Sequence, residues 1–126
     1  MRAVDTNVVV RLFTEDDPDQ AQRAREFMRA GTWISHVVLV ETIWVLQSVY
    51  SRTRDDVKHA VEMLLSNESI TLQEPEVVAA ALGLFTEHRM VSFSDCLVLT
   101  LARKTGNLPL GTFDAKLARI EGSRLV

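Results

Sequence analysis

The stretch RAVDTNVVVRLF, residues 2–13, opens the fold and raises a question about one charge. Arg2 to Val4 is predicted to be a short strand, and the run NVVVRLF after it to be the first helix. Asp5 stands at the junction, where an aspartate is costly to bury unless something compensates its charge. A strand that leads into a helix is typical of an α/β fold, and a polar residue after the strand is a candidate site residue.

The rest of the chain alternates short apolar stretches with helical segments. Pro18 after Asp17, with Gln20 at capping-box spacing, marks one helix start, and Thr53 with Asp56 marks another. The alternation predicts an α/β fold with a mostly parallel central sheet of about five strands. Further strands are predicted at 32–35, 69–72, 108–114 and 123–126, and further helices at 16–31, 35–50, 53–67, 76–88, 93–106 and 115–122.

Length and composition predict one globular domain over residues 1–126. The chain is 47% hydrophobic and 25% charged, which is ordinary for a folded protein. The net charge of −3 gives no global basic signal, so nucleic-acid binding would need a local patch. Cys96 is the one cysteine and cannot form an internal disulfide, and no secretion signal or membrane-spanning apolar run is evident. We therefore expect a cytoplasmic protein with no membrane association.

Four acidic residues stand alone in apolar stretches, whereas most of the other acids lie in mixed-charge segments. They are Asp5, Glu41, Asp95 and Asp114. A lone acid beside an apolar run is often a helix N-cap, a role open to Asp95 and Asp114. Glu41 lies past the first turn of its predicted helix, where neither a cap nor the helix dipole explains it. A structural role for all four together is disfavoured.

The predicted topology would gather these acids at one place. Three follow or end predicted strands, and the helix that holds Glu41 starts directly after the second strand. The carboxyl ends of parallel strands meet at one edge of a sheet, where ligands bind. Crowded carboxylates either protonate or hold a cation, and oxygen ligands without clustered His or Cys favour Mg²⁺ or Mn²⁺ over zinc. The sequence therefore predicts a divalent-metal site.

Four ordered motifs resemble those of the PIN-domain ribonucleases, and among them the VapC-like toxins of bacterial type II toxin-antitoxin pairs. The motifs are DTN at 5–7, VVLVE at 37–41, SFSDCLVLTLA at 92–102 and TFDAKLARI at 112–120. Gly111 stands where the family more usually has an apolar residue, which affects the regularity of that strand. The resemblance covers the whole chain.

The resemblance implies a three-layer α/β/α domain and a Mg²⁺-dependent endoribonuclease that hydrolyses RNA with a metal-activated water. It also implies a homodimer and a cognate VapB-like antitoxin whose tail fills the acidic groove. Glu41 would be a further metal ligand or would orient the attacking water. The residues carried over are Asp5, Asp95 and Asp114 as metal ligands, Glu41, and Thr6, Asn7 and Thr112 in polar supporting roles.

Substrate contacts are expected from cations around the acids, because the carboxylates alone would repel a phosphate. Arg11, Lys116 and Arg119 are candidates, although an exposed Arg or Lys is more often simply solvated. Two alternatives remain open. One is a catalytically silent dimeric regulatory protein with a structural metal, and the other is an aspartyl-nucleophile phosphatase. The phosphatase chemistry wants a second acid at position 7, which is Asn7.

Overall fold

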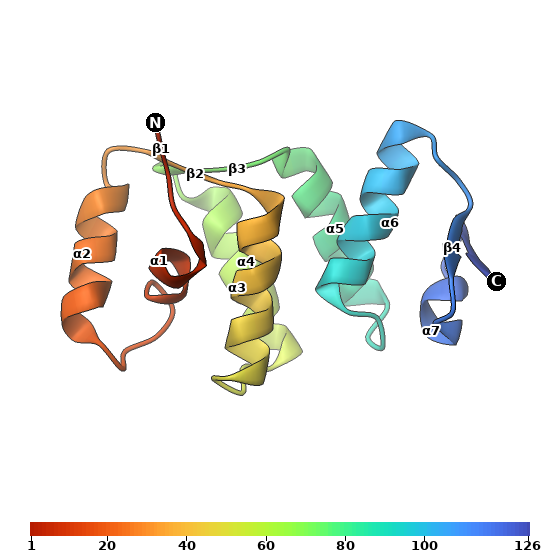
Figure 1. Ribbon diagram of the computed structural model, residues 1–126, viewed down its shortest axis with the longest axis horizontal. Helices are drawn as coiled ribbons and strands as arrows, with labels where there is room; N and C mark the ends of the chain where they lie inside the picture. The colour runs from red at the N-terminus through yellow and green to blue at the C-terminus, as the bar shows by residue number, and fades with distance from the viewer. The chain divides into compact units, whose positions relative to one another are not determined.

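The computed structural model describes all residues, 1–126, as seven helices and five short strands (Figure 1). The chain divides into two compact units, Met1–Pro75 and Glu76–Val126, which are described separately. None of the helices is both long and apolar enough to cross a membrane. The elements are β1 Arg2–Ala3, α1 Thr6–Val10, α2 Pro18–Met28, β2 Thr32–Ile34, α3 His36–Ser48, α4 Arg54–Ser66, β3 Ile70–Leu72, α5 Pro75–Glu87, α6 Phe93–Thr105, β4 Leu110–Thr112, α7 Ala115–Ala118 and β5 Ser123–Leu125.

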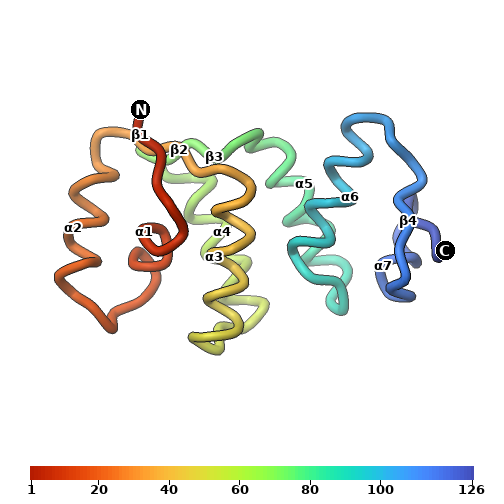
Figure 2. Tube along the Cα trace, in the orientation of Figure 1, coloured from red at the N-terminus to blue at the C-terminus, as the bar shows by residue number.

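The first unit is built on a three-stranded parallel sheet in the order β1-β2-β3. Ala3 pairs with Trp33, and Thr32 pairs with Ile70. Helix α1 lies between α2 and α3 and packs against both, as the trace in Figure 2 shows. Because β1 and β2 are parallel neighbours, α1 and α3 start at the same edge of the sheet. The core between these elements is formed by buried aliphatic side chains, including Val9, Val10, Leu39, Ile43, Leu46, Val57, Val61 and Leu64.

Local capping sets where the helices of this unit begin. Ser35 caps α3 by accepting a hydrogen bond from the Val38 N–H. Thr53 and Asp56 form the expected capping box of α4, with reciprocal side-chain to backbone bonds of 3.1 and 2.9 Å. The backbone N–H of Thr53, donating to the Asp56 carboxylate, lowers the pKa of that group.

The start of α2 departs from the sequence prediction in one detail. Asp17 is the N-cap and accepts from the Gln20 N–H at 3.0 Å, with Pro18 in the first turn. The Gln20 side chain does not complete a capping box, because its Oε1 instead accepts from Nε of Arg11 at 2.7 Å. The Gln20 side chain therefore pairs with Arg11 and not with the backbone at the start of its own helix.

The second unit pairs β4 with β5 in a parallel, two-stranded sheet. Leu110 pairs with Ser123, and Thr112 with Leu125. Helix α7 packs on both strands. Phe85 of α5 and Phe93 of α6 meet edge to face, with ring centroids 5.8 Å apart. These strands and helices confirm the predicted α/β class with five parallel strands, which are hydrogen-bonded here as a sheet of three and a sheet of two.

Candidate functional site

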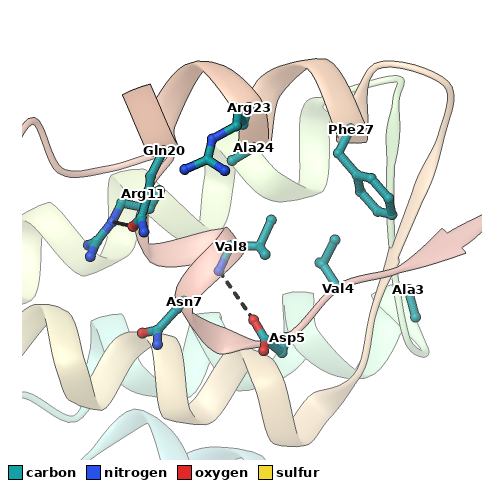
Figure 3. Close-up of a pocket in the computed structure, with 10 residues that line it drawn as sticks. All are labelled: Ala3, Val4, Asp5, Asn7, Val8, Arg11, Gln20, Arg23, Ala24 and Phe27. Atoms are coloured by element: carbon teal, nitrogen blue, oxygen red, sulfur yellow. Dashed lines mark hydrogen bonds between the residues drawn. The ribbon is translucent and has the colours of Figure 1, made fainter. Parts of the chain in front are cut away.

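Asp5 lies two residues after β1 and is the N-cap of α1. Its extended backbone (φ −93°, ψ 179°) lets Oδ1 accept from the Val8 N–H at 3.4 Å, as Figure 3 shows. The side chain is exposed, so the expectation of a buried charge is wrong for this residue. The second carboxylate oxygen makes no hydrogen bond and is available to a ligand.

The two residues after Asp5 belong to the first turn of α1. Thr6 is half-buried, and Asn7 is exposed with no hydrogen bond to its side-chain amide. Figure 3 shows the Asp5 and Asn7 side chains at the start of α1. Thr6 and Asn7 directly follow Asp5 in the chain, and their polar supporting role stays a prediction.

Glu41 lies in the second turn of α3. The buried side of this helix carries Leu39 and Ile43, and Glu41 is exposed with no hydrogen bond or ion pair. Trp44, three residues further along the helix, is also exposed, at 65%. Neither capping nor pairing accounts for Glu41, as its sequence position predicted.

Asp95 and Asp114 both lie at helix starts in the second unit. Ser92, not Asp95, is the N-cap of α6, and the Asp95 N–H donates to Ser92 Oγ at 3.1 Å. The partly exposed Asp95 carboxylate therefore lies in the first turn, where the helix dipole favours an anion. Asp114 does cap α7, with Oδ1 accepting from the Lys116 N–H at 2.8 Å.

Thr112 supports the position of Asp114. Its Oγ1 accepts a hydrogen bond of 3.0 Å from the Asp114 N–H, which fixes the turn between β4 and α7. Lys116 and Arg119 follow on this short helix and at its end, and both are exposed. Neither makes an ion pair, so both cations are available to an anionic ligand.

The four candidate acids are therefore divided between the two units. Asp5 and Glu41 belong to the first unit, and Asp95 and Asp114 to the second. The structure contains no group of three or more His, Cys, Asp or Glu residues that could hold a metal ion. The donor chemistry fits Mg²⁺ or Mn²⁺, because all four side chains offer carboxylate oxygens, and each has at least one carboxylate oxygen outside the helix caps.

Arg11 is more firmly held than its sequence context suggested. Its Nε donates to Gln20, its Nη1 donates to Tyr50 Oη at 3.2 Å, and the same Nη1 lies 3.6 Å from Asp16. Tyr50 in turn donates to Asp16 Oδ2 at 2.7 Å. The Tyr50 hydrogen bond, together with the charge of Arg11, lowers the pKa of Asp16.

A cavity of about 510 Å³ adjoins Asp5 in the first unit. Figure 3 shows Gln20, Arg23 and Phe27 of α2 facing β1 and α1 across it. Arg23 and Phe27 are not among the site residues predicted from the sequence. Their spacing is the signal that could have found them, because positions 20, 23, 24 and 27 share one face of a helix.

Comparisons with known proteins cover almost the whole chain. Residues 2–123 match the model of the PIN domain family. A VapC ribonuclease from Aquifex aeolicus is 21% identical, with 95% of this chain and 92% of that protein covered. The crystal structure of Mycobacterium tuberculosis VapC20, described as a Sarcin-Ricin loop cleaving toxin, is 19% identical. The superposition covers 94% of this chain and 93% of the VapC20 chain, with a TM-score of 0.46.

Proposed function

This chain belongs to the PIN domain family, and from that membership we propose that it is a VapC-like ribonuclease, the toxin of a toxin-antitoxin pair. The observation that carries the proposal is the extent of the family match. It spans residues 2–123 and so includes all four candidate acids, from Asp5 to Asp114. The curated relative is named as a ribonuclease and is covered over 92% of its length. We further propose that residues 1–126 act as a single PIN domain.

The candidate acids would hold a divalent cation, Mg²⁺ or Mn²⁺. Asp5, Asp95 and Asp114 would be ligands, and Glu41 would be a further ligand or would orient the attacking water. When bound, the ion would lower the pKa of a water molecule and neutralise charge on the scissile phosphate. This assignment rests on the oxygen-only donor set and on the family membership.

The remaining residues of the site have roles that follow from their chemistry. Thr112 holds the backbone of Asp114, and Asn7 offers an unpaired amide beside Asp5. Lys116 and Arg119 are exposed cations near Asp114 that can contact phosphate oxygens of an RNA. By the family chemistry the water, and not the ribose 2′-hydroxyl, is the nucleophile, and the product carries a 5′-phosphate.

The partners follow from the same proposal. The protein would act in the cytoplasm as a homodimer, inhibited by a VapB-like antitoxin that places an Arg or Lys against the carboxylates. Light scattering should give the mass of a dimer at micromolar concentration, and the product of the adjacent gene should bind with a salt-dependent affinity. A monomer that does not bind this gene product would contradict both partner assignments.

The observed caps favour one competing function. Asp5 and Asp114 stabilise helix starts, as they would in a catalytically silent regulatory protein whose acids are structural or hold a structural ion. Asp95 and Glu41 cap nothing, which favours the nuclease. No observation favours the phosphatase.

Cleavage of RNA by the purified protein tests the proposal. Labelled single-stranded RNA should be cut with Mg²⁺ or Mn²⁺ and left intact with EDTA. Asp95→Asn should abolish cutting while the melting temperature stays close to that of the wild type, because Ser92 supplies the cap. Cleavage that persists in EDTA or in Asp95→Asn would overturn the proposed mechanism.

A further inference from the structure

The cavity beside Asp5 combines an apolar floor with a polar rim. Its floor is formed by small and aromatic side chains, and its rim carries amides and guanidinium groups (Figure 3). A volume of about 510 Å³ lies within the range of roughly 300–1,000 Å³ found for small-ligand sites. One nucleotide, with an apolar base face and an anionic phosphate, matches both the floor and the rim.

Phe27 supplies a stacking surface at one end of this cavity. Phe27 is 42% exposed, and the guanidinium carbon of Arg2 lies 4.6 Å from the centroid of its ring. This cation–π contact restrains the ring before any ligand arrives. Exposed aromatic rings and stacked arginines are the groups on which proteins place unpaired RNA bases.

Arg23 supplies a guanidinium group that can form an ion pair with a phosphate. Its ion-pair partner in the structure is Asp19, at 3.0 Å, and both side chains are largely exposed, at 67% and 79%. Such exposed pairs contribute little and exchange readily for a better anion. Figure 3 shows the Arg23 guanidinium projecting from α2 toward α1 over the cavity.

Gln20 gives the cavity a directed hydrogen-bond donor. Its Oε1 is occupied by Nε of Arg11, and Arg11 is itself fixed by Tyr50 and Asp16. The Nε2 group of Gln20 is therefore the part of the amide left for a ligand, and it can donate to a carbonyl or ring nitrogen of a base. Arg11 is a positioning residue in this arrangement, because it orients Gln20.

We propose that this cavity binds one unpaired nucleotide of an RNA substrate, next to the bond that is cut. The base stacks on Phe27, its edge accepts from Gln20, and its phosphate contacts Arg23. Asp5 lines the cavity and is also a candidate metal ligand, so a nucleotide held here has its phosphodiester link beside the reacting atoms. The identity of the substrate as RNA rests on the proposed function, whereas the fit to a nucleotide rests on the cavity itself.

Binding can be measured without cleavage, on the full chain in EDTA, with adenosine and guanosine 5′-monophosphates as probes. Backbone amide NMR signals of Val8, Ala24 and Phe27 should shift saturably, and inorganic phosphate alone should move them less. Phe27→Leu should weaken binding about tenfold, and Arg23→Ala several-fold. Arg25→Ala is the matched control, because Arg25 is exposed on the same helix and does not line this cavity.

Two results would overturn the proposal. One is the absence of shifts at these amides, or shifts that Phe27→Leu and Arg23→Ala leave unchanged. The other is a response of the same amides to a peptide from the adjacent gene product but not to nucleotides, which would make the cavity a protein-docking site. Nucleotide binding without Mg²⁺-dependent RNA cleavage would support the cavity assignment while contradicting the proposed function, and cleavage without nucleotide binding would do the reverse.

Discussion

The carboxylate of Asp5 caps α1 through one oxygen and leaves the other without a hydrogen bond. The sequence identified Asp5 correctly as an acid after the first strand, but it could not show that a backbone N–H already compensates part of the charge. That N–H belongs to Val8, three residues away, and pairing at this spacing depends on the backbone angles of Asp5. The residue can therefore be both a cap and a metal ligand.

Two substitutions separate these roles of Asp5. Asp5→Asn keeps an N-cap oxygen, so in EDTA it should leave the melting temperature nearly unchanged, whereas it should lower RNA cleavage by about two orders of magnitude or more. Asp5→Ala should lose cleavage and also about 1 kcal/mol of stability. Thermal unfolding and a metal-titrated cleavage assay give both readings. Near wild-type cleavage by Asp5→Asn would remove Asp5 from the site.

Glu41 offers a simpler test, since it has no structural partner to lose. Glu41→Gln should not change stability, and it should lower kcat roughly 100-fold if the carboxylate orients the attacking water. Glu15→Gln is the matched control, because Glu15 is exposed in a mixed-charge segment. Equal rates for the two variants would make Glu41 an ordinary surface acid.

At the scale of single elements, features that depend on neighbouring residues were predicted well, and features that depend on residues distant in the sequence were not. The start of α4 was predicted from its capping residues Thr53 and Asp56 and is confirmed. The Gln20 capping box failed because Arg11, nine residues earlier, competes for the same oxygen. The strands are shorter than predicted, for example β4 at Leu110–Thr112, since their ends depend on pairing partners that a sequence pattern does not show.

The capping box of α4 should make part of the stability depend on pH. Asp56 has a lowered pKa in the folded protein, so its contribution is present above the unfolded pKa and is lost as the pH falls through the folded value. Asp56→Asn lacks this titration. The wild type should therefore be the more stable protein at about pH 7, and the difference should shrink toward about pH 3. A difference that is constant between these pH values, measured by urea unfolding, would contradict the assignment.

At the scale of the whole molecule, two candidate acids lie in each unit. The four were grouped as one candidate site because their motifs follow one another in the order typical of the family. The sequence predicted the four residues and the donor chemistry, because these depend on residue type and on position relative to strands. The sequence could not show which of these acids also cap a helix, as Asp114 does by accepting from two N–H groups of α7. That distinction needs backbone coordinates.

Metal binding should stabilise the folded chain, and one substitution from each unit tests this. Mg²⁺ at ten times its dissociation constant should stabilise the wild type by about 1.4 kcal/mol, because the ion binds only the folded chain. Asp5→Asn and Asp114→Asn, one from each unit, should each remove most of this increment, while Glu15→Gln retains it. Melting curves in EDTA and in Mg²⁺ at matched ionic strength provide the comparison. An increment that survives in both variants would place the metal elsewhere.

Trp44 gives the protein an optical reporter of its own. The indole of Trp44 is exposed and lies three residues from Glu41 on the same helix. A protein that binds over Glu41 should therefore change the polarity around this indole or quench its fluorescence. Trp33, the only other tryptophan, is 37% exposed, and Trp33→Phe would leave Trp44 as the single emitter. The emission maximum of that variant should then move to shorter wavelength when a protein covers this part of α3, and fluorescence titration could follow inhibitor capture in real time without any attached dye.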